Sequence, residues 1–256
     1  MTNSTWKFKE MTKINPKATI LIEGLPGMGN VGKIAVDFMI ETLEAKKIYE
    51  ISSYTLPHCA FINENNIVEL PKISLFYKKV KGNEFVFLAG DVQPLSELDC
   101  YEFCDNILNL FKKNKLKEII TLGGIGLGNI PDEPKLYCAL TDKKQTPKYK
   151  GLKKAYGFVG PIVGVSGVLA GMAKERKIPG SVLLAETFSH PNYLGIKGAR
   201  ELLKFLDKNY KLGLKLKTLD KEINELESEI KTKLDQISEI NDETFKKGGE
   251  ATNYIG

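Results

Sequence analysis

Runs of apolar residues alternate with amphipathic stretches along the first 210 positions of the chain. The β-branched run at 18–24 predicts a buried strand, because apolar residues fill successive positions until a glycine ends them. A glycine-rich loop follows, and apolar residues then recur at helical spacing over 31–43. A second strand near 48–54 would complete a β-α-β unit.

The same alternation continues downstream. Strands are predicted at 84–90, 117–123 and 181–188, and helices at 96–114, 163–177 and 195–210. Three short runs, 59–62, 67–70 and 73–80, predict hairpin strands inserted into this plan, and the charged stretch 142–154 predicts an exposed loop. Strands that alternate with helices of ten or more residues are typical of a three-layer α/β/α domain with a mainly parallel sheet.

The pattern divides the chain into an N-terminal arm or edge strand (1–14), a core domain (15–212), a long amphipathic helix (213–243) and a tail (244–256). In the helix, apolar residues recur at spacings of three and four, as in a coiled coil or bundle, with a break at Lys233. Because such a seam is marginal when exposed, either a second copy or the chain's own domain must cover it, and self-association is favoured. The seam consists of Leu216, Leu219, Ile223, Leu226, Ile230, Ile237 and Ile240.

The tail carries two adjacent glycines, so its last residues are expected to be mobile. Tyr254, Ile255 and Gly256 could then act as a tethered anchor for a partner's pocket. A frayed end without a function explains the same residues equally well.

Composition narrows the class of protein. The sequence has no apolar run of 18 residues and no signal-peptide pattern, and its four cysteines do not suggest a disulfide framework, so a cytoplasmic protein that does not span a membrane is expected. Residues 1–212 carry a net charge of +8, but the chain has only two arginines and its lysines are scattered. These features favour a solvated lysine-rich surface over nucleic-acid binding.

The sharpest motif lies between the first strand and its helix. Gly27, Gly29 and Gly32 satisfy the G-x-G-x-x-G pattern of dinucleotide sites, and Glu50 lies 18 residues beyond Gly32, near the spacing of a ribose-binding acid. However, Glu50 falls inside its predicted strand rather than at the strand's end. The alternative is a tight turn whose glycines permit positive φ angles and close packing.

Glycine loops also follow other predicted strands, and the carboxyl ends of parallel strands share one edge of a sheet, where a ligand crevice forms. Asp91, Glu186 and His190 could meet there. The candidate crevice residues are Gly27, Gly29, Asn30, Gly32, Asp91, Gly124, Glu186 and His190.

No catalytic constellation emerges from the sequence. Val168 stands where a nucleophile elbow around Ser166 requires glycine, and only His58 and His190 could serve as a histidine base. Cys100 and Cys104 lie one helical turn apart, but no further ligands suggest a metal site, and a core thiol is favoured. A protein that is not an enzyme and has neither a cofactor nor a metal is therefore expected.

Several motifs together resemble one family. Gly-Leu-Pro-Gly-Met-Gly-Asn-Val-Gly at 24–32, Ala-Gly-Asp-Val-Gln-Pro at 89–94, Leu-Gly-Gly at 122–124, Gly-Val-Ser-Gly-Val-Leu-Ala-Gly at 164–171 and Pro-Asn-Tyr at 191–193 occur in this order. In this combination the chain resembles the proteasome assembly chaperone 2 family, in particular its archaeal members. The resemblance covers residues 15–212.

The resemblance implies a single α/β/α domain, related in fold to nucleoside phosphorylases, that self-associates and binds α-subunits of the 20S proteasome. Proteasome activators and chaperones of this kind dock through a C-terminal hydrophobic-tyrosine-any tripeptide. Here Tyr254 occupies the hydrophobic position and Ile255 replaces the tyrosine. The expected function is a proteasome-associated assembly chaperone or adaptor, and the alternative is an enzyme or sensor that binds a nucleotide or small metabolite in the glycine-loop crevice.

Overall fold

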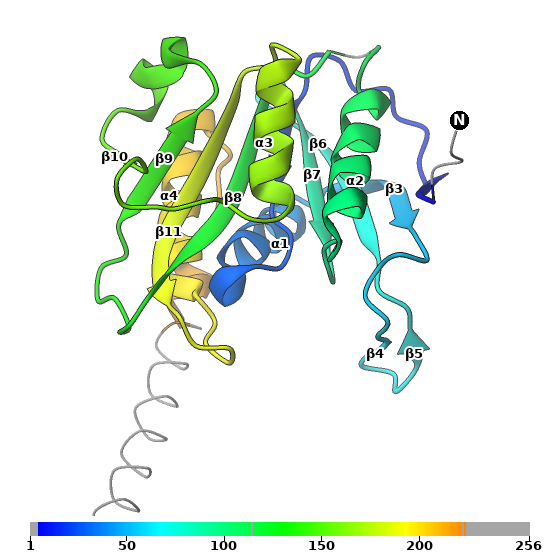
Figure 1. Ribbon diagram of the computed structural model, residues 1–256, viewed down its shortest axis with the longest axis horizontal. Coiled ribbons are helices and arrows are strands. Elements are labelled where there is room, and N and C mark those ends of the chain that lie inside the picture. Colours follow the sequence, from blue (N-terminus) through cyan, green and yellow to red (C-terminus); the bar gives the residue numbers. More distant parts are fainter. Residues whose placement is uncertain (1–4, 114, 222, 224–256) are drawn as a thin grey trace, which may run out of the picture. The chain divides into compact units, whose positions relative to one another are not determined.

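A computed structural model describes residues 5–113, 115–221 and 223. The chain divides into two compact units, Met1–Lys215 and Leu216–Gly256. The described strands of the first unit form a nine-stranded sheet in the order β1-β3-β6-β7-β2-β8-β11-β9-β10, while β4 and β5 form a separate pair (Figure 1). The strands are β1 Lys7–Glu10, β2 Ile20–Glu23, β3 Lys46–Ser52, β4 Phe61–Ile62, β5 Val68–Glu69, β6 Ile73–Val80, β7 Asn83–Gly90, β8 Glu118–Leu127, β9 Leu136–Leu140, β10 Lys153–Lys154 and β11 Gly180–Phe188.

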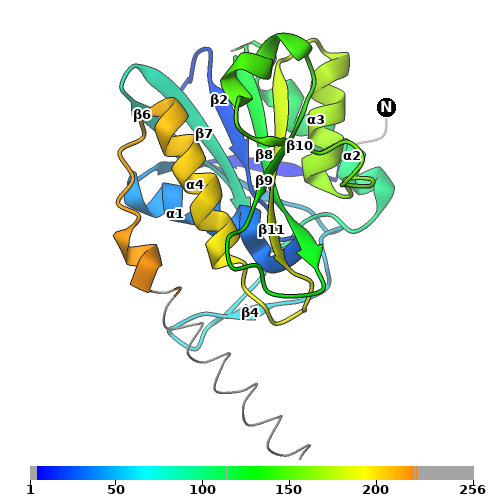
Figure 2. The same cartoon turned by 90° about the vertical axis from the view of Figure 1, so that its left-hand side faces the viewer.

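Helices cover both faces of this sheet, which confirms the predicted three-layer α/β/α architecture. The helices α2 and α3 lie on one face and α1 and α4 on the other (Figures 1 and 2). The four central strands β7, β2, β8 and β11 are parallel, as predicted, whereas antiparallel pairs flank them. The helices are α1 Val31–Thr42, α2 Glu97–Leu110, α3 Val165–Glu175 and α4 Ile196–Tyr210, with short 3-10 helices η1 Met28–Asn30 and η2 Lys143–Tyr149.

The largest described part of the core fills the space between the sheet and the α2–α3 layer. Every residue of β2 is buried, as expected for a strand in the centre of a sheet covered on both faces. On α2, Ser96 caps the helix by accepting a hydrogen bond from the Asp99 amide, and Phe103 is fully buried. The Trp6 ring packs 4.7 Å from the Phe103 ring, so the N-terminal segment closes this side of the core.

Two sequence-based expectations for the N-terminal half need correction or refinement. The strand β3 follows α1 and runs parallel to β2, as in the predicted β-α-β unit, but β6 and β7 lie between these two strands in the sheet. The cause is local pairing: β6 and β7 form a hairpin, and β3 adds to its outer strand. Of the two predicted forms of the N-terminal segment, the edge strand is observed, since β1 pairs with β3.

The C-terminal half of the sheet also differs from the prediction. The strand β8 continues through the glycine-rich segment to Leu127 instead of ending at Gly123, because β11 pairs with it along its whole length. Strand β9 was not predicted. The stretch 142–154 is mostly exposed, as predicted, but it is not a plain loop. It contains η2 and β10 and buries Tyr149, whose hydroxyl donates to the buried carboxylate of Glu118.

The second unit is described only at its start, where residues 217–221 and 223 are helical. Most of the predicted long helix and all of the predicted tail lie outside the described residues. Among the described residues, no helix is long and apolar enough to span a lipid bilayer.

Candidate functional site

The sheet has two chemically different edges. The four central parallel strands begin at what we call the amino edge and end at the carboxyl edge, where the loops after β2, β7, β8 and β11 lie. All eight residues of the predicted crevice belong to loops, strand ends or a helix start on the carboxyl side.

The glycines between β2 and α1 are in close contact with the rest of the protein. A Cβ atom on Gly32 would lie 2.3 Å from the carbonyl oxygen of Leu122, and one on Gly124 would lie 2.3 Å from that of Met28. Gly29 has a φ angle of +59° and its Cα faces the Thr187 side chain, while its carbonyl accepts a hydrogen bond from Gly195. These contacts favour the close-packing interpretation of the motif, because they hold η1 against β8 and β11.

Two crevice residues in this loop are less constrained. A Cβ on Gly27 would meet no other atom within 4 Å, and Asn30 precedes α1 in the left-handed conformation without a side-chain cap. Asn30 donates its amide hydrogen to the Gly27 carbonyl, so the turn closes on itself.

The structure does not bring Asp91, Glu186 and His190 together. Strands β2 and β8 separate β7 from β11, which places Asp91 and Glu186 about 14 Å apart at the spacing of strands in a sheet. Asp91 accepts a hydrogen bond from the Lys72 amide, whereas Glu186 turns toward β9 and accepts from Tyr137 and the Lys135 amide. His190 is exposed and stacks on Phe188, so each group has a separate local role.

A polar cluster instead lies beneath the carboxyl edge, where three of the sequence motifs meet. Glu23 ends β2 and is fully buried; one carboxylate oxygen accepts from the Leu25 amide and the other from the Ser166 hydroxyl, at 2.8 Å. Gln93 donates to the Pro26 carbonyl and accepts from the Val165 amide, so it joins the glycine loop to the start of α3. Sequence reasoning missed Glu23 and Gln93, although a single carboxylate at the end of an apolar strand was a usable signal.

Burial changes the acidity of this cluster. It raises the pKa of Glu23 to about 7, and the hydrogen bonds from Leu25 and Ser166 offset only part of the effect. The pKa of Cys104 is raised by its hydrogen bond with Cys100 and by burial, so this thiol is protonated, as predicted for a core cysteine. The cluster therefore holds a buried carboxyl group whose pKa lies near neutral pH.

Above this cluster, the carboxyl edge exposes many apolar side chains. Of the 15 large apolar residues that are exposed among those described, 12 lie in loops at this edge or in the elements that start there. Five belong to the β4–β5 hairpin and its flanks, including Ile62, Val68 and Leu70 at 70%, 69% and 73% exposure. Soluble monomers rarely expose so many neighbouring apolar groups without a partner. The edge residues are Met28, Tyr54, Phe61, Ile62, Ile67, Val68, Leu70, Leu95, Leu98, Tyr101, Val163 and Leu194.

The amino edge gathers cationic residues from four loops that are far apart in the sequence. The loops that lead into β2, β7, β8 and β11 hold nine Lys and Arg residues and no Asp or Glu. Next to them, the buried Glu118 accepts hydrogen bonds from Tyr149 at 2.7 Å and Tyr210 at 2.8 Å and pairs with Lys148. Eight lysines and Arg176, which come from four separate loops, therefore share one edge of the sheet.

The predicted C-terminal contacts fall largely beyond the described residues. Leu216, Leu219 and Ile223 of the seam lie at its start, while Leu226, Ile230, Ile237 and Ile240 lie outside the described residues. So do Tyr254, Ile255 and Gly256. The seam and the anchor therefore remain predictions from the sequence.

The chain is similar over most of its length to two solved archaeal structures and to a further archaeal protein. PbaB of Pyrococcus furiosus, an archaeal proteasome activator, is 29% identical with a TM-score of 0.80, covering 89% of this chain and 98% of PbaB. PbaA of the same organism, an archaeal homologue of proteasome-assembly chaperone, is 25% identical with a TM-score of 0.72, covering 92% and 99% of the two chains. An uncharacterized protein of Methanocaldococcus jannaschii is 28% identical over 93% of this chain and 92% of its own length.

The relatives match this chain over nearly its whole described length, so the similarity concerns the complete domain and not one motif. The sequence pattern of the PAC2 family, which the motifs had indicated, matches residues 21–234. The chain belongs to the PAC2 family.

Proposed function

We propose that this protein is a proteasome-associated assembly chaperone or adaptor, a homo-oligomer that binds proteasome α-subunits through its C-terminal helix and tail. The observation that carries the proposal is the full-length similarity to PbaB, a proteasome activator, at 29% identity and a TM-score of 0.80. The similarity to PbaA, a homologue of a proteasome-assembly chaperone, supports the same class of activity.

The chemistry of the carboxyl edge fits a binding protein better than an enzyme. Gly32 and Gly124 pack against backbone carbonyls, Asp91 is separated from Glu186, and Asp91, Glu186 and His190 each have their own local partners. This edge exposes apolar side chains to solvent, and apolar surface forms the centre of many protein–protein contacts.

Multivalency gives the proposed mechanism its strength. If several copies assemble, each contributes one tail, and the first tail that binds raises the effective concentration of the others near neighbouring α-subunits. Individually weak contacts can then hold a ring of α-subunits together. The departure of the last three residues from the hydrophobic-tyrosine-any pattern makes a weak single contact the expected case.

Co-purification with proteasome α-subunits tests the proposal. The full chain should retain α-subunits, and a chain that ends at Lys247 should retain at least tenfold less, because it lacks residues 248–256. Ile255→Tyr, which restores the tripeptide, should bind more tightly than the natural chain, while Thr252→Ala serves as the matched control and should bind equally.

The outcomes separate the two parts of the proposal. Undiminished binding by the truncated chain would remove the tail from the mechanism and leave the α-subunit contact elsewhere. A full chain that retains no α-subunit under conditions where PbaB retains them would refute the proposed function.

A further inference from the structure

A pocket of about 690 Å³ lies at the amino edge, between the C-terminal ends of α2 and α3 and the start of β8. This volume is within the range of pockets that take a ligand or a few protein side chains. Apolar residues provide part of its wall and cations surround it, while no carboxylate is among the lining residues. These are Leu108, Asn109, Phe111, Lys112, Lys115, Leu116, Arg176, Lys177 and Ile178.

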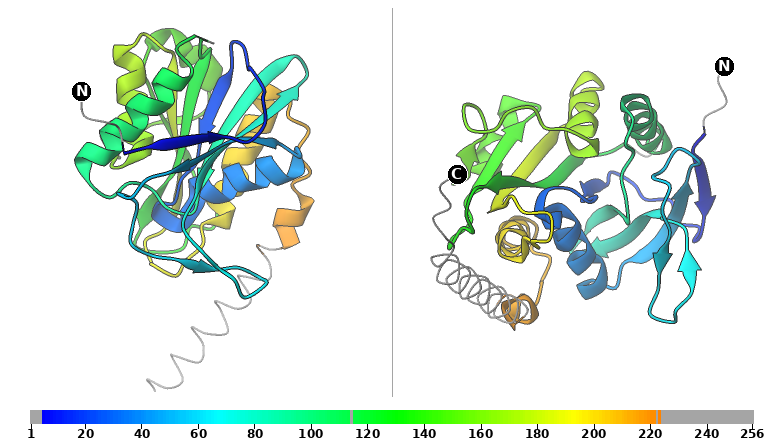
Figure 3. Two further views of the ribbon diagram at one scale, coloured as in Figure 1. Left: turned by 90° about the vertical axis from the view of Figure 1, so that its right-hand side faces the viewer. Right: turned by 60° about the horizontal axis from the view of Figure 1, so that its bottom comes forward.

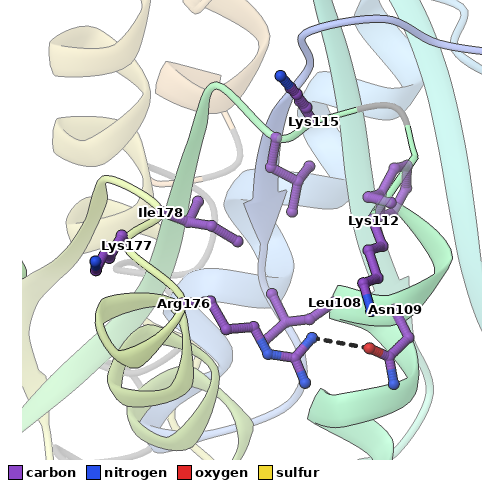
Figure 4. Close-up of a pocket in the computed structure, with 9 residues that line it drawn as sticks. Leu108, Asn109, Lys112, Lys115, Arg176, Lys177 and Ile178 are labelled. Carbon is purple, nitrogen blue, oxygen red and sulfur yellow. Dashed lines mark hydrogen bonds between the residues drawn. The ribbon is translucent and has the colours of Figure 1, made fainter.

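Figure 4 shows how these side chains are arranged. Leu108 and Ile178 point into the space between the two helix ends, and Arg176 crosses it to donate a hydrogen bond to Asn109 at 3.1 Å. The ammonium groups of Lys115 and Lys177 extend outward at its rim. The pocket therefore presents an apolar interior within a positively charged opening.

The opposite edge of the same molecule carries a structure of complementary chemistry. The β4–β5 hairpin projects from the carboxyl edge as a separate two-stranded sheet (Figures 1 and 3). Ile62, Val68 and Leu70 are all about two-thirds or more exposed. No lysine or arginine occurs in residues 48–71, whereas Glu64 and Glu69 lie in the hairpin.

The hairpin is a well-formed structure despite its lack of a core. The Asn63 side chain accepts hydrogen bonds from the Asn65 and Ile67 amides and donates one to Glu69, and Glu69 pairs with Lys72 at 3.0 Å. Two-stranded hairpins are marginally stable alone, so an ordered hairpin with exposed apolar residues is best explained by a surface that receives it.

We propose that the β4–β5 hairpin of one copy docks into the α2–α3 pocket of a second copy. The apolar face of the hairpin, with Ile62 and Val68, would pack over the pocket lined by Leu108 and Ile178, and Glu64 in the turn would face the lysine rim. A second copy is the occupant that the charges favour, because the chain itself supplies both the acidic apolar projection and the basic apolar recess.

This contact has a defined symmetry. Hairpin and pocket are different surfaces at opposite edges, so the contact is head-to-tail, and repeating it closes a ring or extends a filament. It is separate from the predicted C-terminal seam and goes beyond the proposed function. It is tested on the purified chain alone, so its failure would leave proteasome binding untouched.

Paired full-length variants provide the test. A hairpin variant, Ile62→Ser with Val68→Ser, and a pocket variant, Lys112→Glu with Lys177→Glu, should each self-associate at least tenfold more weakly than the natural chain in sedimentation velocity. Mixed together, they should form a 1:1 heterodimer, because one intact hairpin then meets one intact pocket. A matched variant, Lys143→Glu with Lys150→Glu, makes the same charge change elsewhere on the amino edge and should associate like the natural chain.

Crosslinking detects the contact between hairpin and pocket directly, whether or not the predicted C-terminal seam also joins the copies. Cys59 is an exposed thiol near the hairpin, and a short thiol-to-amine reagent should join it to Lys112, Lys115 or Lys177 of a copy that carries a different isotope label. If both variants keep the natural mass distribution and no such crosslink joins differently labelled chains, the proposal is overturned.

Discussion

The two edges of the sheet carry opposite chemistry, although the same four parallel strands connect them. The loops that enter these strands hold nine cationic residues and no carboxylates, while the loops that leave them hold three carboxylates and one lysine. The carboxyl edge also carries most of the exposed apolar side chains. Because the two edges lie at opposite ends of the same strands, their complementary surfaces can contact each other only between two molecules. Each edge can also contact a different partner.

Among the described residues, the amino edge contains one buried glutamate, Glu118, and the carboxyl edge contains two, Glu23 and Glu186. Glu118 and Glu23 differ in their partners. Glu118 at the amino edge accepts from two tyrosine hydroxyls and a glutamine amide and pairs with a lysine. Glu23 at the carboxyl edge accepts from one amide and one serine hydroxyl. Glu118 is therefore held by four side chains, whereas Glu23 has one side-chain partner and a much less compensated burial.

Removal of the Glu118 carboxylate should change the free energy of unfolding more than the other substitutions described below. Glu118→Ala leaves the buried hydroxyls of Tyr149 and Tyr210 without their shared acceptor and should lower the free energy of unfolding by about 3–5 kcal/mol. Urea denaturation measures the change. Glu175→Ala, at an exposed position on α3, should stay within about 0.5 kcal/mol, and a Glu118→Ala loss as small as this would show that the network is not stabilising.

The Glu23 carboxyl should make the carboxyl edge pH-dependent. Its folded pKa, about 7, lies above the ordinary value of 4.5, so the folded state holds the proton more tightly than the unfolded state. The stabilisation is fully present below pH 4.5 and is lost as pH rises through 7. Relative to Glu23→Gln, the natural chain should therefore lose about 3 kcal/mol between pH 4.5 and 8.

Urea denaturation of both proteins across this pH range measures the difference. Glutamine suits the site, because its oxygen can accept from Leu25 while its amide donates to Ser166. Glu133→Gln, at an exposed position, is the control and should keep the natural pH dependence. Parallel stability curves for Glu23→Gln and the natural chain would mean that Glu23 does not titrate in this window.

Filling a glycine contact should have a smaller effect. Gly124→Ala places a methyl group 2.3 Å from the Met28 carbonyl and should cost about 1–3 kcal/mol through displacement of η1. Gly128→Ala, in the same segment but with no atom within 4 Å, should be nearly neutral. Equal stabilities of the two variants in thermal unfolding would contradict the packing role assigned to these glycines.

Most secondary structure was predictable because a buried element shows a characteristic spacing of apolar residues within a short stretch of sequence. The apolar run of β2, the capped start of α2 and the amphipathic pattern of α4 each indicated the element that is observed. The predicted end of β8 was wrong because glycine usually ends a strand, while here it permits β11 and η1 to approach. Strand β9 is short, and its pairing with β11 comes from residues far away in the sequence.

The candidate site was predictable only in part, because its contacts join residues that are far apart in the sequence. The sequence identified the crevice residues as neighbours of strand ends, but strand order decides which ends are adjacent, and it separates Asp91 from Glu186. Glu23 and Gln93 belong to motifs that the sequence had marked. Their connection through Ser166 and Val165 depends on where α3 begins in space.

The sequence by itself determined the α/β class, the family and the chemical character of each segment, because periodicity, glycine positions and charge are properties of short stretches. Only the tertiary structure decided that lysines from separate loops share one edge and that apolar hairpin residues share the other. Parallel strands connected by helices return every entry loop to one side and every exit loop to the opposite side. That geometry places cationic residues from separate loops at one edge and exposed apolar residues at the other.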